Sequence, residues 1–140
     1  MPSQCFPRRA RAVSLIAILA AACGGGLPTD PLSPRALAGA YTLRTVGGAP
    51  LPLDVVPGLS QLVADEIRLG VDGTYSQRTS FVNTPSGRRG DSEERGEWFV
   101  RDSAVYLRVP DPRVALRYSA AERNTLKAEG VRGLMVYRRK

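Results

Sequence analysis

The sequence predicts an all-β fold: a single antiparallel up-and-down β-barrel of about eight strands, with a β-sandwich as the alternative. Short runs of alternating apolar and polar residues recur at a spacing of roughly 8–12 residues, which is typical of barrels and sandwiches. The connections between these runs are short and rich in glycine, proline and aspartate, and no long helix is indicated. Short connections in sequence order favour a meander, and closing it into a barrel removes the edge strands that promote aggregation.

The N-terminal element, residues 1–22, is a predicted export signal. Arg8, Arg9 and Arg11 precede an apolar run that ends in Leu19-Ala20-Ala21-Ala22-Cys23. These are the charged, apolar and small-residue regions of such a signal. The apolar run is shorter than the ~20 residues that a transmembrane helix needs, so we expect it to be cleaved rather than to span a membrane permanently.

The end of this run resembles the lipobox of bacterial lipoproteins. In that family the signal is cut just before the cysteine, whose sulfur carries diacylglycerol and whose new amino group is acylated. The resemblance implies that Cys23 is lipidated, that several acyl chains anchor it durably to a membrane, and that the protein is exported to the cell envelope. Gly24 implies the outer membrane if the organism is Gram-negative. The alternative is a secreted protein cut near Ala22, in which Cys23 is incidental.

Composition limits the function classes. The 140-residue sequence carries a formal charge of +7 and contains no histidine. Three arginines leave with the signal, and the remaining basic residues form no concentrated stripe, so nucleic-acid binding is disfavoured. The remaining chain suffices for one domain, which we expect to be a monomer. Cys5 also leaves with the signal, so Cys23 has no partner for an intramolecular disulfide.

Residues 23–35 form a predicted lipid-anchored flexible tether, because they are rich in glycine and proline. Ser33-Pro34 offers an N-cap followed by proline at the first helical position, and Gly39 offers a stop. This pattern predicts about one helical turn over residues 35–38. The barrel domain is expected over residues 36–140.

The first strand is marked by Tyr41, Leu43 and Thr45, which alternate with their neighbours. The prolines within residues 51–63 exclude a central strand there. A second alternating run ends at Asp72-Gly73, the strongest local hairpin signal, so the return strand is expected over residues 74–83.

The second half of the chain begins with a polar segment, residues 84–95, which contains Pro85, Gly87 and Gly90. We expect it to be the longest exposed loop. Strands are then predicted around residues 97–101, 105–109, 114–118, 125–129 and 134–138.

Several short motifs resemble the small lipocalin-like lipoproteins of bacteria. They are Gly39-Ala40-Tyr41-Thr42-Leu43, Leu69-Gly70-Val71-Asp72-Gly73-Thr74-Tyr75 and Val136-Tyr137-Arg138. Those families share a Gly-x-aromatic start, an Asp-Gly-Thr-Tyr hairpin and an aromatic-Arg end. The resemblance spans about residues 36–139 and implies a lipocalin-like barrel. It also implies that Arg138 or Arg139 packs over Tyr41 in a structural cation–π contact that closes one barrel end.

The residues that could carry chemistry are few. Without histidine there is no Ser-His-Asp or Cys-His system and the commonest metal ligand is missing. Asp91, Glu93 and Glu94 lack the ordered spacing of a calcium loop and are flanked by arginines, which favours a solvated segment. Asp65 and Glu66 are adjacent, so in a strand they point to opposite faces and form no catalytic pair. We predict no catalytic site, no metal site and no cofactor.

The apolar phases of the strands are expected to point into the barrel. They are Tyr41, Leu43, Ile67, Leu69, Val71, Tyr75, Trp98, Val100, Val105, Leu107, Leu116, Tyr118 and Leu126. A barrel of about eight strands is either filled by side chains or holds one small ligand. In the ligand hypothesis, the binding residues are Tyr75, Trp98, Leu107 and Tyr118, with the two tyrosine hydroxyls as polar groups.

The sequence therefore predicts a non-enzymatic, lipid-anchored envelope protein that binds a small apolar or amphipathic ligand in its barrel. The alternative is a structural or protein-interaction module with a filled core, for example an inhibitor of an envelope hydrolase that acts through residues 84–95.

Overall fold

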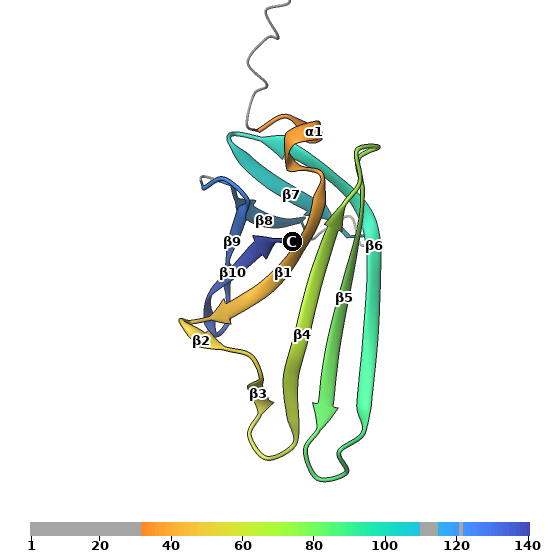
Figure 1. Ribbon diagram of the computed structural model, residues 1–140, viewed down its shortest axis with the longest axis vertical. Coiled ribbons are helices and arrows are strands. Elements are labelled where there is room, and N and C mark those ends of the chain that lie inside the picture. Colours follow the sequence, from red (N-terminus) through yellow and green to blue (C-terminus); the bar gives the residue numbers. More distant parts are fainter. Residues whose placement is uncertain (1–31, 110–114, 121) are drawn as a thin grey trace, which may run out of the picture.

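The computed structural model describes residues 32–109, 115–120 and 122–140. They form a closed eight-stranded antiparallel β-barrel with two additional outer strands, which confirms the predicted fold class (Figure 1). The elements are α1 (Pro34–Leu37), β1 (Gly39–Val46), β2 (Ala49–Pro50), β3 (Leu53–Val56), β4 (Ser60–Leu69), β5 (Thr74–Asn83), β6 (Arg89–Arg101), β7 (Ala104–Arg108), β8 (Ala115–Ser119), β9 (Thr125–Gly130) and β10 (Gly133–Arg139). The predicted signal and Cys23 lie outside the described residues.

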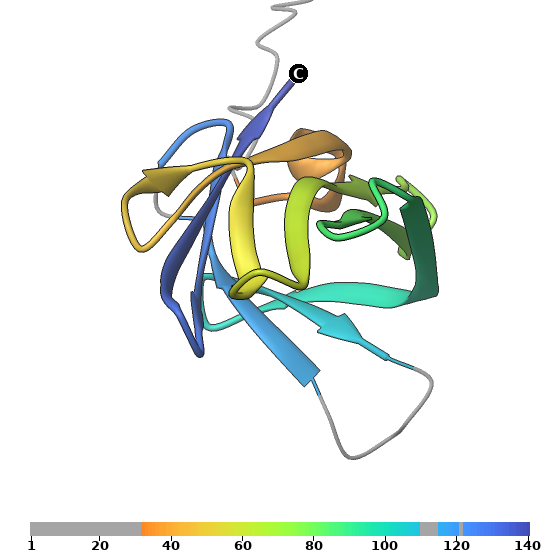
Figure 2. The same cartoon turned by 90° about the horizontal axis from the view of Figure 1, so that it is seen from below.

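The barrel is an up-and-down meander from β4 to β10 that β1 closes. Tyr41 of β1 lies opposite Arg139 of β10 on one side and opposite Ile67 of β4 on the other. Further along, β1 pairs with β2 instead of β4, and β3 pairs with the start of β4. The eight strands thus form a ring around the core, as the view along the barrel shows (Figure 2).

The short helix α1 lies at one end of the barrel (Figure 1). The Ser33 hydroxyl accepts a hydrogen bond from the Ala36 N–H at 3.2 Å, and Pro34 is the first helical residue, as the sequence predicts. The buried Tyr41 hydroxyl donates to the Leu37 carbonyl at 2.8 Å. This bond ties α1 to the first barrel strand. In the part of the chain that the structure describes, no helix has the length and apolar character needed to span a membrane.

The predicted hairpin at Asp72-Gly73 is confirmed. Asp72 Oδ1 accepts hydrogen bonds from the Thr74 N–H at 3.0 Å and from the Thr74 hydroxyl at 2.7 Å. Gly73 has φ 82°, a conformation that side chains disfavour, so the turn requires glycine here. The return strand β5 covers the predicted residues.

The expected loop over residues 84–95 is wrong: β6 begins at Arg89 and pairs with β5 along most of its length. On the outer face, Asp91 Oδ2 lies 2.6 Å from Arg78 Nη2, and its other oxygen accepts from the Ser80 hydroxyl at 2.6 Å. Opposite charges across neighbouring strands stabilise a sheet, so a polar segment can be a strand. Figure 1 shows β4, β5 and β6 extending beyond the other strands.

The core fills the barrel between the two ends. Most of the predicted inward residues are buried in it, but Val71 is 71% exposed and Leu116 is 40% exposed. Val71 lies beyond the end of β4, where the strand alternation has already ended in the turn. The structure adds residues that the prediction lacked. They are Leu37, Val46, Ala120, Ala128 and Tyr137.

Candidate functional site

The four predicted ligand-binding residues lie together in the core. Tyr75, Trp98, Leu107 and Tyr118 are 3%, 4%, 0% and 1% exposed. A side chain that lined a cavity large enough for water would keep accessible surface, so these residues are packed as in an ordinary protein interior. The indole N–H of Trp98 donates to the Gly70 carbonyl at 2.8 Å, which is a structural use of its polar atom. This burial favours the filled-core alternative at the centre of the barrel.

A buried carboxylate, Asp65, lies beside these residues on β4. It is 5% exposed and accepts hydrogen bonds from the Tyr137 hydroxyl at 2.7 Å, the Gln77 amide at 2.9 and 3.1 Å, and the Thr79 hydroxyl at 3.2 Å. Burial raises the pKa of Asp65, and these hydrogen bonds only partly oppose it. A buried carboxylate is costly unless it is hydrogen-bonded, so these hydrogen bonds offset the cost of burying Asp65.

Sequence reasoning did not select Asp65, although it placed Asp65 and Glu66 on opposite faces correctly. Glu66 points outward and pairs with Arg68 at 2.6 Å and with Lys140. The available signal was that Asp65 has the same phase as Ile67 and Leu69, an acidic residue on an otherwise apolar face.

The two tyrosines expected to serve as polar groups for a ligand are already engaged. Tyr75 donates from its hydroxyl to Glu94 Oε1 at 2.6 Å. Tyr118 is hydrogen-bonded to Tyr137, and the two rings meet edge-to-face with centroids 5.8 Å apart. Burial raises the pKa of both Tyr75 and Tyr118, so both hydroxyls stay protonated at neutral pH.

A hollow of about 720 Å³ lies instead at the end of the barrel that carries α1. Its volume is typical of small-molecule sites, which span roughly 300–1,000 Å³. Four separate parts of the chain line it: α1 with the start of β1, the β6–β7 turn, the turn before β9, and the end of β10. The lining residues are Leu32, Ala36, Leu37, Tyr41, Ser103, Ala120, Glu122, Arg123, Asn124 and Arg139. We call this feature the α1-end hollow.

Of the two arginines that the family resemblance named, Arg139 is the one beside Tyr41. The two are register partners, whereas Arg138 lies opposite Thr42 and is exposed. The predicted Tyr41–Arg138 contact is therefore corrected to Arg139, because one residue along a strand reverses the face. The Arg139 guanidinium donates to the Ala36 carbonyl at 2.9 Å and to the Ala38 carbonyl. It thus closes the barrel end through hydrogen bonds to α1 and its cap.

Gly39 makes this position of Arg139 accessible. A Cβ at Gly39 would lie 2.6 Å from Arg139 Nε, and the backbone φ of 151° is one that side chains rarely adopt. Both facts require glycine at the start of β1.

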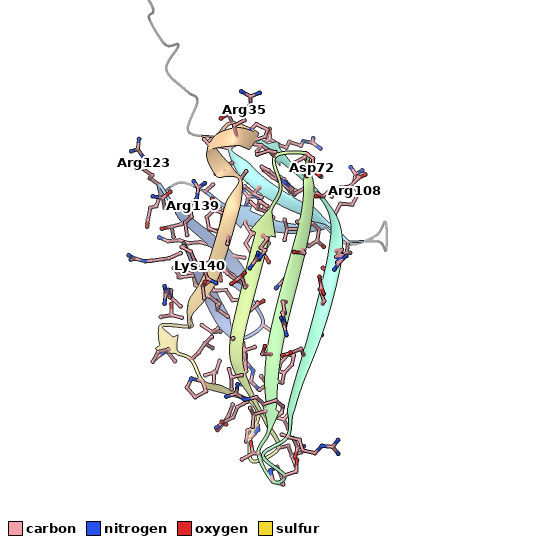
Figure 3. All side chains as sticks on the ribbon, turned by 45° about the vertical axis from the view of Figure 1, so that its right-hand side comes forward. Arg35, Asp72, Arg108, Arg123, Arg139 and Lys140 are labelled. Carbon is pink, nitrogen blue, oxygen red and sulfur yellow. The ribbon has the colours of Figure 1, made fainter. Side chains whose placement is uncertain are left out.

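Arg123 lies in the turn before β9, at the same end of the barrel as Arg35 and Arg139 (Figure 3). Within residues 32–109, 115–120 and 122–140, no group forms a hydrogen bond or ion pair with Arg123. Its neighbour Glu122 is bound to Lys127. The α1-end hollow therefore has an apolar wall, from α1 and Ala120, and a basic rim.

The acidic residues considered for calcium do not converge. Asp91 binds Arg78, Glu93 binds Arg95 at 2.8 Å, and Glu94 accepts from Tyr75. Among the described residues, no group of three or more acidic or cysteine side chains is placed to hold a metal ion.

Comparison of the chain with protein-family models, with curated proteins and with solved structures finds no match. The interpretation of the site therefore rests on its own geometry.

Proposed function

We propose that this protein is a non-enzymatic binding protein of the cell envelope, anchored by lipid on Cys23, which holds a small amphipathic molecule at the α1 end of its barrel. The α1-end hollow of about 720 Å³ carries this proposal. Leu32, Ala36 and Leu37 offer an apolar wall for a hydrocarbon chain, and the arginines of the rim offer hydrogen-bond donors for a polar group.

The ligand is assigned to the barrel end rather than the barrel centre. The residues expected to surround a central ligand, such as Leu107 and Tyr118, are packed and have almost no accessible surface. Opening a ligand-sized space among them would sacrifice their packing and the hydrogen bonds of Asp65. A ligand in the α1-end hollow leaves both the core packing and the hydrogen bonds of Asp65 intact.

The location also suits an anchored protein. The helix α1 precedes β1 in the chain and lies at this end of the barrel, beside the hollow, so the chain reaches the barrel here. A tether that leads from this end to a lipid-bound Cys23 keeps the hollow near the membrane surface, where amphipathic molecules are concentrated.

Native mass spectrometry tests this function. The protein with Cys23→Ser cannot be lipidated and is recovered without detergent from a bacterial host. We expect a discrete extra mass that denaturation removes, or one that appears after incubation with a C12 amphiphile. Ala36→Trp should abolish it by filling the hollow, whereas Ala64→Trp, on the outer face of β4, should not. A bare mass after incubation would contradict the proposal.

A protein-interaction module is the second candidate, and the open edge of β6 favours it. In the described part of the chain, β7 pairs only with residues 97–101, so residues 89–96 pair with β5 alone. An unpaired edge can accept a strand from a partner. A photoreactive residue at Ser92 in the native envelope should then crosslink one protein, while one at Arg132 should not; no adduct at Ser92 rules this candidate out.

A further inference from the structure

We propose that the α1-end hollow selects amphiphiles whose polar group is an anion, a carboxylate or a phosphate, and that Arg123 and Arg139 bind that group. This inference rests on the proposed function and names the ligand class of the same site. Four observations, one for each feature of the site, support it.

The guanidinium of Arg139 is held in place without being neutralised. Its partners at Ala36 and Ala38 are uncharged carbonyl oxygens, and no carboxylate of the described residues forms an ion pair with it. A guanidinium has five N–H groups, so donors remain for a ligand. Because the side chain is fixed before binding, little conformational entropy is lost when it accepts an anion.

The turn that carries Arg123 is attached to the strand that carries Arg139. The Arg139 N–H donates to the Asn124 carbonyl at 2.9 Å. Asn124 has φ 62°, a left-handed conformation that asparagine tolerates and that shapes this turn. Both arginines line the same hollow, and the paired donors of a planar guanidinium fit two oxygens of a carboxylate or a phosphate.

The one carboxylate in the lining does not compensate these charges. Glu122 is bound to Lys127, which holds the pKa of Glu122 below its usual range. Tyr41 is neutral, because burial raises its pKa. The hollow therefore presents two uncompensated cations and no free anion, which disfavours a cationic ligand.

The rest of the lining includes an apolar wall. Leu32, Ala36 and Leu37 come from α1 and the residues just before it, and Ala120 directly follows β8. Such a wall binds a hydrocarbon chain but adds nothing to the binding of a free inorganic anion. The lining thus fits both parts of an anionic amphiphile.

Titration calorimetry on the full chain with Cys23→Ser separates the contribution of the ligand's anionic group from that of its hydrocarbon tail. The probes are laurate, dodecyl phosphate, dodecanol and dodecyltrimethylammonium, which share one tail, together with inorganic phosphate, which has none. We expect laurate or dodecyl phosphate to bind at least about tenfold more tightly than dodecanol, because hydrogen bonds between two charged groups are stronger than those of a neutral hydroxyl. The cationic probe and inorganic phosphate should bind much more weakly. The two anionic probes show whether the carboxylate or the phosphate is preferred.

Single substitutions assign the anion site. Arg123→Gln should lower laurate affinity by about tenfold and leave dodecanol affinity unchanged. Arg139→Lys keeps the charge but loses the planar donor pair, and should also lower laurate affinity. Arg35→Gln is the matched control, because Arg35 is exposed at the same end and does not line the hollow; it should change neither affinity.

Each contrary outcome has a distinct meaning. Equal affinities for laurate and dodecanol, or an Arg35→Gln effect as large as that of Arg123→Gln, would overturn the anion assignment and leave the binding function intact. Inorganic phosphate as tight as dodecyl phosphate would overturn the amphiphile requirement. Binding of none of the C12 probes would overturn the proposed function itself.

Discussion

The Tyr137 hydroxyl donates a hydrogen bond to Asp65 Oδ2 at 2.7 Å, joining strands β10 and β4 across the inside of the barrel. Both side chains are almost fully buried, Tyr137 at 0% and Asp65 at 5% exposure. Because β1 lies between these two strands in the barrel wall, the bond links the last strand to a strand near the start of the chain.

Tyr137→Phe should destabilise the protein by about 1–3 kcal/mol, because it leaves one lone pair of a buried carboxylate without its donor. Urea denaturation followed by Trp98 fluorescence measures this loss. Tyr106→Phe is the matched control: Tyr106 lies on the outer face, where its ring stacks on Phe99 with centroids 5.4 Å apart. Tyr106→Phe should lower the free energy of unfolding far less than Tyr137→Phe does. Equal losses would show that the lost contact with Asp65 does not cause the destabilisation.

Asp65 should make stability depend on pH. Burial raises the pKa of the Asp65 carboxyl above its ordinary value of 3.8. The folded state therefore holds this proton more tightly than the unfolded state. The contribution of Asp65 to the free energy of unfolding is complete below pH 3.8 and is lost as the pH rises through the pKa of the folded state. Carboxyls whose pKa is lowered, such as Glu66 and Asp91, act in the opposite direction.

A comparison with Asp65→Asn isolates this effect, since both proteins share the other carboxyls. The free energy of unfolding of the native protein should fall relative to that of Asp65→Asn as pH rises from about 3.5 to 7. Denaturant titrations at several pH values measure it. A difference between the two proteins that stays constant over this range contradicts the assignment.

Gly39→Ala should destabilise the protein by about 1–3 kcal/mol and displace Arg139, through backbone strain and the close approach of the new methyl group. Gly48→Ala separates these causes. Gly48 has φ 85° but nothing within 4 Å of the added Cβ, so only strain of about 1 kcal/mol applies. Thermal denaturation should rank Gly39→Ala as the worse variant, and Gly39→Ala alone should weaken laurate binding. An equal loss for both would mean that Arg139 moves aside freely.

Hydrogen exchange should show β6 as a strand with one open edge. Residues 89–96 pair with β5 on one side only, so slowly and rapidly exchanging amides should alternate along this segment. Residues 75–82 of β5, which pair with β4 on one side and with β6 on the other, should be protected more uniformly. Rapid exchange at every amide from 89 to 96 would instead describe a loop.

Local patterns predicted much of the fold. The N-cap Ser33 with Pro34, the hairpin at Asp72-Gly73 and the alternating strands around them depend on interactions within a few residues, which the sequence states directly. The first half of β6 was missed for the opposite reason. Its charged residues become compatible with a strand only when Arg78 and Ser80 of β5 lie beside Asp91.

For the candidate site, too, some properties could be predicted from the sequence and others depend on the tertiary structure. The sequence by itself determined that histidine-based chemistry is excluded and gave the phase of most strands, because composition and alternation are properties of the residues in order. Only the tertiary structure decided that Arg139 and not Arg138 lies beside Tyr41, and that Arg123 lines the same hollow as α1. Strand register and barrel closure bring together residues that are far apart in the chain, and no local sequence pattern encodes which of these residues come into contact.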